Sequence, residues 1–323
     1  MSSRIEHEVS ERGETQPRVF AVMPTYNRWD EARVSLRRLL ESDYANLHIL
    51  LVEDACTDGT VEKCRAEFPE VEILHGDGNL WWSGATNMGS RHALDAGADL
   101  ILWINDDIRV EPQTVSALVA SHLRQGARTV VCARIVRPDG EQEWRGDPPP
   151  WHPAHKTWRA PELPTAGDLA IEHPPGGQGV LIPAGCFREI GFLDRENFAM
   201  NWADHNFHYR AMRAGYRYFI SPAAVVRERA NREPPQAKNV FTLRGAWWFL
   251  TNRRSYGNMR ALRRHLKRCL PPAEYRRIFY PILARHLAWL SYGWLTTKPL
   301  LHKPLSAAKR TVAPRRDAGA PTR

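Results

Sequence analysis

Closely spaced cysteines are missing from this 323-residue chain, which has only five cysteines, odd in number and widely separated. No CxxC pair occurs among them. Disulfide frameworks and zinc sites use paired or closely spaced cysteines. The spacing therefore argues against both and predicts reduced thiols in a cytoplasmic protein.

Long apolar runs and several nucleotide-binding loops are missing as well. No run of roughly eighteen apolar residues occurs, so no transmembrane helix is predicted. The N-terminus is polar and mixed in charge, unlike a secretory signal. Neither a GxGxxG turn nor a GxxxxGK[ST] loop follows the first predicted strand. Their absence from the sequence argues against a dinucleotide-dependent dehydrogenase and a P-loop NTPase.

The charge of the chain is unevenly distributed, although its 43% apolar and 25% charged residues are ordinary for a globular protein. Residues 227–323 contain 22 Lys and Arg against 4 Asp and Glu, a balance of +18. Since the total is +9, the other 226 residues carry 23 against 32, or −9. We expect an acidic catalytic body with a basic extension directed at an anionic partner.

Short apolar runs alternate with helix-like segments over the first hundred residues. The runs predict buried strands at 18–23, 47–52, 71–74 and 100–104. The segments between them predict helices at 30–42, 60–68 and 84–96. This order predicts an α/β fold with a right-handed, doubly wound, mostly parallel sheet.

The stretch 100–107 is the most informative, because an apolar strand ends there in Asn105, Asp106 and Asp107. Adjacent carboxylates at the edge of a core repel each other and need a cation or hydrogen-bond donors to stay ionised. Oxygen ligands of this kind suit Mg²⁺ or Mn²⁺. A solvated turn with three polar residues is the competing interpretation.

Polar clusters also follow the first two predicted strands. Thr25 and Asn27 come after the first strand, and Glu53 with Asp54 comes after the second. The carboxyl ends of parallel strands share one edge of the sheet, so all these side chains are expected to converge on one crevice.

Taken in order, the motifs of the chain resemble glycosyltransferase family 2, which has the GT-A fold. They are PTYNR at 24–28, VEDACTDGT at 52–60, NLWWSGATNMG at 79–89, NDD at 105–107, GQGVLIPAGCFREIGFLD at 177–194 and ADHNFHYRAMRAGY at 203–216. The WWSGATN variant is most similar to rhamnosyltransferase-like members. The resemblance covers about residues 18–230. It implies inverting, metal-dependent transfer from a nucleotide-diphosphate sugar to a glycan or lipid-linked acceptor, as in cell-wall or polysaccharide synthesis.

The resemblance places the donor-binding residues at the strand ends and in the segment after the third strand. These residues are Pro24, Thr25, Asn27, Glu53, Asp54, Trp82, Gly84, Asn87 and Asp106. Glu53 stands where the family more often has Asp. Ordinary core packing is the alternative explanation for Trp82 and for Gly84.

The same resemblance implies the metal ligands. Asp107 matches the last acid of the family's DxD-type motif, whereas Asn105 replaces the first. Asp106 is assigned either to the metal or to the ribose. Glu228 stands where the family often has a third ligand, usually His.

Asp204 matches the general base of the family, with Ala203 in place of a preceding Glu. An inverting displacement needs a carboxylate on the face opposite the leaving diphosphate. Capping of a predicted helix that ends near Ala214 is the alternative role for Asp204. Four further residues are candidates for the acceptor or sugar side: Gly177, Gln178, Trp202 and His205.

The basic extension is predicted to form one or two helices at 240–270 and an aromatic amphipathic stretch at 274–295, broken at Pro281. Interleaved aromatics and arginines over 240–310 favour peripheral contact with an anionic membrane, at the inner face of the plasma membrane. A homo-oligomer interface ranks second, and nucleic acid ranks last.

These patterns divide the chain into four parts. We predict a disordered tail at 1–16, a GT-A domain at 17–230 with a nucleotide-sugar half (17–128) and an acceptor half (129–230), a helical extension at 231–305 and a disordered tail at 306–323.

Two other functions fit parts of the pattern. A sugar nucleotidyltransferase shares the broad fold and the metal, but it is expected to have a Gly-rich, basic loop where this chain has PTYNR. A non-catalytic sugar- or lipid-binding protein on the same fold is the other alternative. The presence of both Asp107 and Asp204 argues against it.

Overall fold

The computed structural model describes residues 16–137, 142–143, 163–165, 167–173, 175–229, 240–253, 255, 257–270 and 272–297. Most of the Pro- and Trp-rich interval at 144–175 lies outside the described residues. The predicted tails at 1–16 and 306–323 also lie outside them, apart from residue 16.

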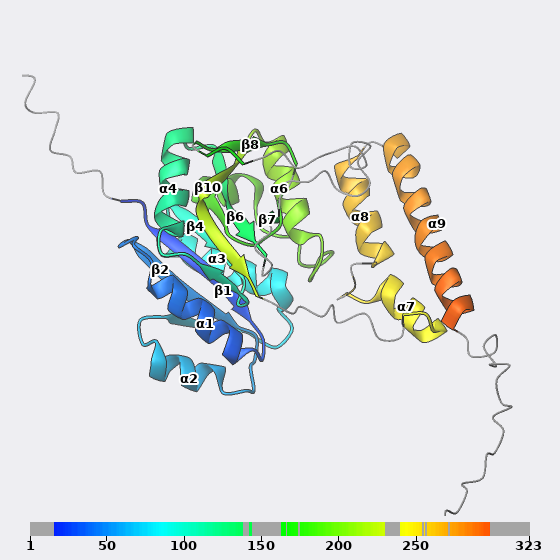
Figure 1. The fold of residues 1–323 in the computed structure, drawn as a ribbon, viewed down its shortest axis with the longest axis horizontal. Coiled ribbons are helices and arrows are strands. Elements are labelled where there is room, and N and C mark those ends of the chain that lie inside the picture. The colour runs from blue at the N-terminus through cyan, green and yellow to red at the C-terminus, as the bar shows by residue number, and fades with distance from the viewer. Residues whose placement is uncertain are drawn as a thin grey trace, which may run out of the picture.

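Strands and helices alternate through the α/β part of the chain (Figure 1). In order they are β1 (Val19–Thr25), α1 (Trp29–Leu40), β2 (Leu47–Glu53), α2 (Thr60–Glu67), β3 (Glu72–His75), α3 (Trp81–Asp95), β4 (Leu100–Trp103), β5 (Ile108–Val110), α4 (Thr114–Gln125), β6 (Thr129–Val136), β7 (Gln142–Glu143), β8 (Leu169–Ile171), β9 (Val180–Pro183), α5 (Ala184–Ile190), α6 (Ala203–Arg213) and β10 (Arg217–Glu228).

The strands form one mixed sheet in the order β3-β2-β1-β4-β9-β6-β10-β5, with β7 beside β6 and β8 beside β10. The first four strands of this order are parallel, and so are β6 and β10. Strand β9 runs antiparallel between β4 and β6. The α/β fold with a mostly parallel sheet is thereby confirmed.

The register of the parallel strands aligns their amino ends and points their carboxyl ends the same way. Val19 in β1 pairs with Leu47 in β2 and with Leu100 in β4, so the three strands start level. Their loops therefore leave the sheet along one edge, as the sequence predicts.

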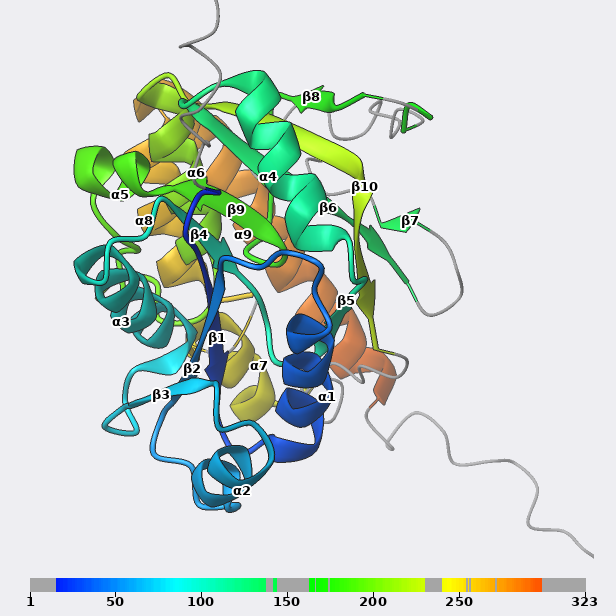
Figure 2. The same cartoon turned by 90° about the vertical axis from the view of Figure 1, so that its left-hand side faces the viewer.

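Helices cover both faces of the sheet (Figure 2). On one face, apolar residues of α1 and α4, such as Leu36 and Leu118, pack with β1, β2 and β6. On the other face, residues of α3, α5 and α6, such as Phe187 and Phe207, pack around Trp103 of β4. Burial of the sheet on both faces explains why its strands are apolar runs without alternation.

After the sheet, the described residues form three helices: α7 (Leu243–Thr251), α8 (Met259–Cys269) and α9 (Pro272–Thr297). Helix α8 packs between α6 and α9 (Figure 1). Leu262 and Leu266 of α8 share a buried cluster with Tyr275 and Phe279 of α9. Among the residues that the structure describes, no helix combines the length and the apolarity needed to cross a membrane.

The predicted break at Pro281 is wrong, because α9 continues through it. An internal proline removes one backbone hydrogen bond and tends to kink a helix. Here the neighbouring residues Phe279 and Ile282 are buried against α8, and this packing offsets the lost hydrogen bond.

Candidate functional site

The loop after β4 places two buried carboxylates at the edge of the sheet. Asp106 is 5% exposed and Asp107 is 7% exposed. The Arg28 guanidinium joins them, with Nη1 2.9 Å from Asp106 Oδ1 and Nη2 3.1 Å from Asp107 Oδ2. The Thr25 hydroxyl donates to Asp106 Oδ2 at 2.9 Å. The two carboxylates are therefore held by the positively charged Arg28 side chain, so the interpretation as a solvated turn does not apply.

Glu228 lies at the end of β10, opposite Ile108, the residue that follows Asp107. An irregular register between Ser221 and Val225 in β10 precedes this pairing. Within the described ranges, no three His, Cys, Asp or Glu side chains are gathered to hold a metal ion. The third ligand thus stays a prediction.

The acids after β2 shape the neighbouring loops. Asp54 accepts backbone N–H groups of Gly78 (2.8 Å), Leu80 (3.2 Å) and Trp81 (3.0 Å). These bonds hold the start of α3, where Trp81 has a φ of 57°. They explain why the helix begins at Trp81, three residues before the predicted start. A cap supplied by a distant strand is not visible in the local sequence.

Glu53 supports the same edge. Its carboxylate accepts the Cys56 backbone N–H at 2.7 Å and lies 2.7 Å from Nδ1 of His75. Asn27 ties the PTYNR turn to this loop, since its side-chain oxygen accepts the Thr57 N–H at 2.6 Å. Pro24, the first residue of that turn, pairs with Val52 of β2. The PTYNR turn and the loop after β2 therefore form one connected unit.

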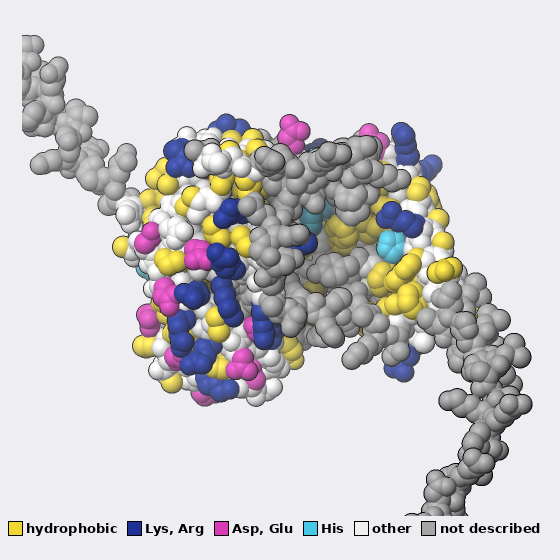
Figure 3. Space-filling view, in the orientation of Figure 1, with side chains coloured by type: hydrophobic (Ala, Val, Ile, Leu, Met, Phe, Trp, Pro, Cys, Tyr) yellow, Lys and Arg dark blue, Asp and Glu magenta, His cyan; other side chains and the backbone are white. Residues whose placement is uncertain are grey.

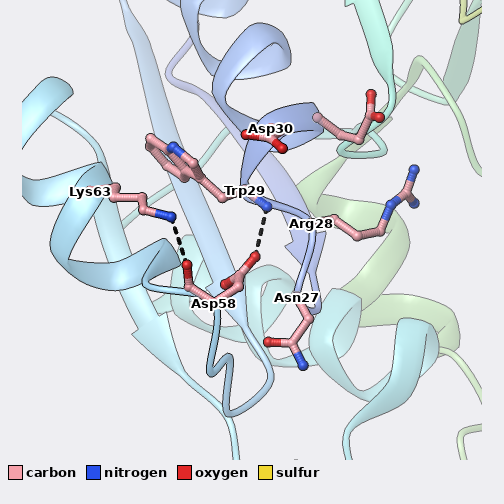
Figure 4. Close-up of a pocket in the computed structure, with 7 residues that line it drawn as sticks. Asn27, Arg28, Trp29, Asp30, Asp58 and Lys63 are labelled. Atoms are coloured by element: carbon pink, nitrogen blue, oxygen red, sulfur yellow. Dashed lines mark hydrogen bonds between the residues drawn. The ribbon is translucent and has the colours of Figure 1, made fainter.

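A shallow pocket opens beside the PTYNR turn (Figure 4). It is lined by Asn27, Arg28, Trp29, Asp30, Glu31, Asp58 and Lys63. Asp58 accepts the Trp29 backbone N–H at 2.9 Å, and Lys63 donates to the Asp58 carbonyl at 2.7 Å. Figure 4 shows Arg28 extending away from this pair. Arg28 is the last residue of the PTYNR motif, but no local sequence signal marks it as a partner of Asp106 and Asp107.

Asp204 lies in the first turn of α6, half-buried, and its carboxylate accepts the His205 backbone N–H at 2.8 Å. A Cβ atom placed on Gly177 would lie 3.4 Å from the Asp204 Cβ and 2.6 Å from the Trp82 ring. The structure thus brings Trp82, Gly177 and Asp204 together. The hydrogen bond to His205 also supports the helix-capping alternative.

Two other residues predicted on the acceptor side lie near α8. The Trp202 ring stacks on His265 at 5.6 Å between centroids, and it lies 5.7 Å from His205. This contact joins the helical extension to the start of α6.

Gln178, the remaining residue predicted on the acceptor or sugar side, is 7% exposed, and within the described residues nothing donates a hydrogen bond to its side-chain oxygen.

Asn87 and Gly84 have packing roles in α3. Asn87 is 2% exposed and exchanges two hydrogen bonds with the Leu193 backbone, at 2.8 and 2.9 Å. A Cβ on Gly84 would lie 3.2 Å from the Leu80 side chain. The packing explanation therefore accounts for both residues, and their contact with a diphosphate stays a prediction.

Two buried histidines make the stability of the fold sensitive to acid. Burial lowers the pKa of His208 and of His265 to about 3. Between roughly pH 6.5 and 3, the unfolded chain takes up protons that the folded chain cannot, so stability falls as the pH falls. Each histidine contributes about 1.4 kcal/mol per pH unit to this loss.

We expect the His265→Gln variant to lose less unfolding free energy between pH 7.5 and 5.5 than the unsubstituted chain. Urea unfolding at both pH values measures this. His48→Gln, at an exposed position, is the matched control. An identical pH dependence in the His265→Gln variant and the unsubstituted chain would contradict the assignment.

A mixed, mostly parallel sheet covered by helices, with acid pairs after β2 and β4 on either side of β1, defines this chain as a protein with the GT-A fold. The comparisons with solved structures agree with this class. The mannosyltransferase PcManGT from Pyrobaculum calidifontis, solved with GDP-Man and Mn²⁺, is 17% identical, with a TM-score of 0.53, over 88% of this chain and 73% of that one. GalNAc-T7, solved with UDP, GalNAc and Mn²⁺, is 13% identical, with a TM-score of 0.56, over 89% of this chain and 59% of that one.

Sequence comparison then identifies a family for part of the chain. Residues 20–169 match the sequence model of Glycosyl transferase family 2, and this segment is assigned to that family.

Two curated relatives match the chain over part of their length. An undecaprenyl-phosphate mannosyltransferase of Micrococcus luteus is 30% identical over 126 residues, 37% of this chain and 51% of that protein. The low-salt glycan biosynthesis hexosyltransferase Agl10 of Haloferax volcanii is 25% identical over 147 residues, 45% of this chain and 47% of that protein. The chain spans about half the length of these relatives.

Proposed function

We propose that this chain transfers a sugar from a nucleotide-diphosphate sugar to a hydroxyl of a glycan or lipid-linked acceptor, with inversion. The observation that carries the proposal is that Thr25, Asp54 and the Asp106–Asp107 pair lie at one edge of the sheet. Asp204 lies close to this edge, because Gly177 is packed between it and the Trp82 ring. The names of the two curated relatives, a mannosyltransferase and a hexosyltransferase, support the same reaction class. The resemblance of the WWSGATN motif to rhamnosyltransferase-like members makes a rhamnosyl donor one candidate.

The donor is proposed to lie along the strand ends. The PTYNR turn and the loop after β2 flank the nucleoside, and Asp54 faces the base. Asp107 and Asp106, with Glu228, are the residues that would hold Mg²⁺ or Mn²⁺. The two buried carboxylates fit a cation, because the Arg28 guanidinium already bridges them. A divalent ion would supply neutralisation of the charge that develops on the leaving diphosphate.

Asp204 is proposed as the general base. The acceptor hydroxyl oxygen attacks the anomeric carbon as the bond to the diphosphate breaks, and the hydroxyl proton passes to the Asp204 carboxylate. Trp202 and His205 lie at the start of the same helix, where they are placed to contact the acceptor. Gly177 and Gln178 are proposed to lie on the sugar side.

Thermal unfolding with a panel of nucleotide-diphosphate sugars, with and without Mn²⁺, tests the donor proposal. A specific ligand stabilises the folded state by mass action, by about 2.7 kcal/mol at one hundred times its Kd. We expect one nucleotide to raise the midpoint, and to raise it further with Mn²⁺. A panel without any stabilising nucleotide would refute the donor site.

We further propose that the predicted extension, residues 231–305, brings the GT-A domain at 17–230 to an anionic membrane at the cytoplasmic face. Exposed apolar side chains gather on α7 and α9: Leu243, Trp247, Tyr280, Leu287, Trp289 and Tyr292. Figure 3 shows hydrophobic side chains on this part of the molecule with Lys and Arg at the margins. Arg244, Arg276, Arg277 and Arg285 are exposed on the same two helices. Aromatic rings settle at the headgroup level, and each nearby Arg contributes on the order of 1 kcal/mol.

Vesicle co-sedimentation tests the membrane proposal. The full-length chain is expected to pellet with anionic but not with neutral vesicles, and to dissociate at high salt. A Trp247→Ser/Tyr292→Ser variant is expected to remain in solution. Leu123→Ser, which removes an exposed apolar side chain from α4, is the matched control and is expected to pellet. If the unsubstituted chain does not co-sediment with anionic vesicles at low salt, the membrane proposal is wrong. The apolar surface of α7 and α9 is then assigned to an interface with another subunit.

A further inference from the structure

The Trp82 side chain lies between the loop after β4 and the segment that contains Gly177. Its indole N–H donates to the Asn105 side-chain oxygen at 3.0 Å. Its ring packs edge-on against Trp103 of β4, with centroids 6.1 Å apart and planes at 82°. One end of the indole is therefore fixed to the first residue of the Asn105-Asp106-Asp107 sequence.

The other end of the indole touches the backbone next to the proposed base. A Cβ on Gly177 would lie 2.6 Å from both Cη2 and Cζ2 of Trp82, closer than real Cβ contacts allow. The same point is 3.4 Å from the Asp204 Cβ. Only glycine lets the backbone at 177 pass this close to the Trp82 ring, while the contact on the Asp204 side is at an ordinary distance.

These contacts form a continuous connection from Asn105 through Trp82 and Gly177 to Asp204. An indole is rigid, and here both of its ends are held, so it fixes the separation of the two segments that it joins. In an in-line displacement, the separation between the phosphate-binding side and the base decides the rate. A displacement of the reacting groups by about 1 Å can lower the reaction rate by on the order of 10²-fold.

We infer that Asn105 and Trp82 are positioning residues that set the distance between the donor phosphates and Asp204. This inference rests on the proposed function. The role of Asn105 in this account is the acceptance of the indole N–H by its side-chain oxygen.

A double-mutant cycle with Trp82→Phe and Asn105→Ala tests the inference. Each single variant is expected to lower kcat by roughly 10- to 100-fold. The double variant is expected to be no slower than the slower single variant, because both substitutions remove the same hydrogen bond. The Kd for the nucleotide diphosphate with Mn²⁺ is expected to change by less than about twofold, since neither residue binds the nucleotide in this account.

Asn105→Asp is the conservative variant, since it keeps an oxygen that accepts the indole N–H. We expect its kcat to exceed that of Asn105→Ala by about tenfold, a rescue that loss of packing alone would not produce. Circular dichroism and the thermal midpoint check that each variant is folded. If Trp82→Phe does not fold, the comparison of Asn105→Ala with Asn105→Asp carries the test alone.

Three results would overturn the inference. Multiplicative losses in the double variant would show that Trp82 and Asn105 act separately. Weakened Mn²⁺-dependent nucleotide binding in Asn105→Ala would make Asn105 a ligand instead. An Asn105→Asp variant as slow as Asn105→Ala would show that the side-chain oxygen that accepts the indole N–H does not affect kcat. Any of these results with an active unsubstituted enzyme refutes this inference alone, whereas an unsubstituted chain that transfers no sugar refutes the proposed function.

Discussion

Replacing Asp204 with asparagine is expected to lower kcat by about 10²-fold or more, with nucleotide affinity unchanged. Asparagine cannot take up the proton of the acceptor hydroxyl. It does keep a side-chain oxygen that can accept the His205 N–H, so the start of α6 is expected to persist. Steady-state release of the nucleotide diphosphate gives kcat, and calorimetric titration with the nucleotide gives the affinity.

Asp95→Asn is the matched control, because it makes the same chemical change at an exposed position near the end of α3. It is expected to be as active as the unsubstituted chain. If Asp204→Asn instead loses nucleotide affinity and turnover in parallel, Asp204 is a positioning or capping residue and not the base.

The Asp107→Ala variant is expected to lose the Mn²⁺-dependent part of nucleotide diphosphate binding while its fold persists. Removing Asp107 leaves a single carboxylate, which the Arg28 cation already neutralises. Arg28 is 41% exposed, so the lost ion pair is expected to cost about 1 kcal/mol of stability or less. Calorimetric titrations with and without Mn²⁺ measure the effect.

Asp77→Ala separates metal binding from a general loss of negative charge. Asp77 is exposed in the loop between β3 and α3, where its carboxylate accepts the Asn79 N–H. This control is expected to keep the full effect of Mn²⁺. A folded Asp107→Ala variant with unchanged Mn²⁺-dependent affinity would remove Asp107 from the metal site.

The sheet edge was predictable because its signal is local. Each buried strand is a run of apolar residues, and each run ends in polar residues such as Thr25, Glu53 or Asp106. The rule that parallel strands share their carboxyl ends then places these residues together. The register of β1 with β2 and β4 bears this out.

The partners of these residues were not predictable, because they come from distant parts of the chain. Asp54 caps α3 from the end of β2, and Arg28 bridges two carboxylates that lie nearly eighty positions later. Trp202 meets His265 across more than sixty residues. No periodicity or motif spacing encodes such contacts; they arise when the sheet and the helical extension pack.

At Pro281 the local sequence predicted a break in the helix, and packing against α8 prevented it. Proline in a helical pattern normally indicates an end, yet α9 runs on through it. The burial of Phe279 and Ile282 on α8 outweighs the missing hydrogen bond. Contacts with α8 therefore determine that α9 continues, and such contacts cannot be read from the local sequence.

The central claim is that the chain uses a nucleotide-diphosphate sugar as its donor. Its most direct test is the release of nucleotide diphosphate from a panel of UDP-, GDP-, dTDP- and ADP-sugars by the full chain with Mn²⁺. We predict that at least one donor is consumed, that Asp107→Ala consumes none, and that Asp204→Asn consumes it at least about 10²-fold more slowly. Consumption at the same rate by Asp107→Ala, or no binding and no consumption of any donor by the folded chain, would contradict the account.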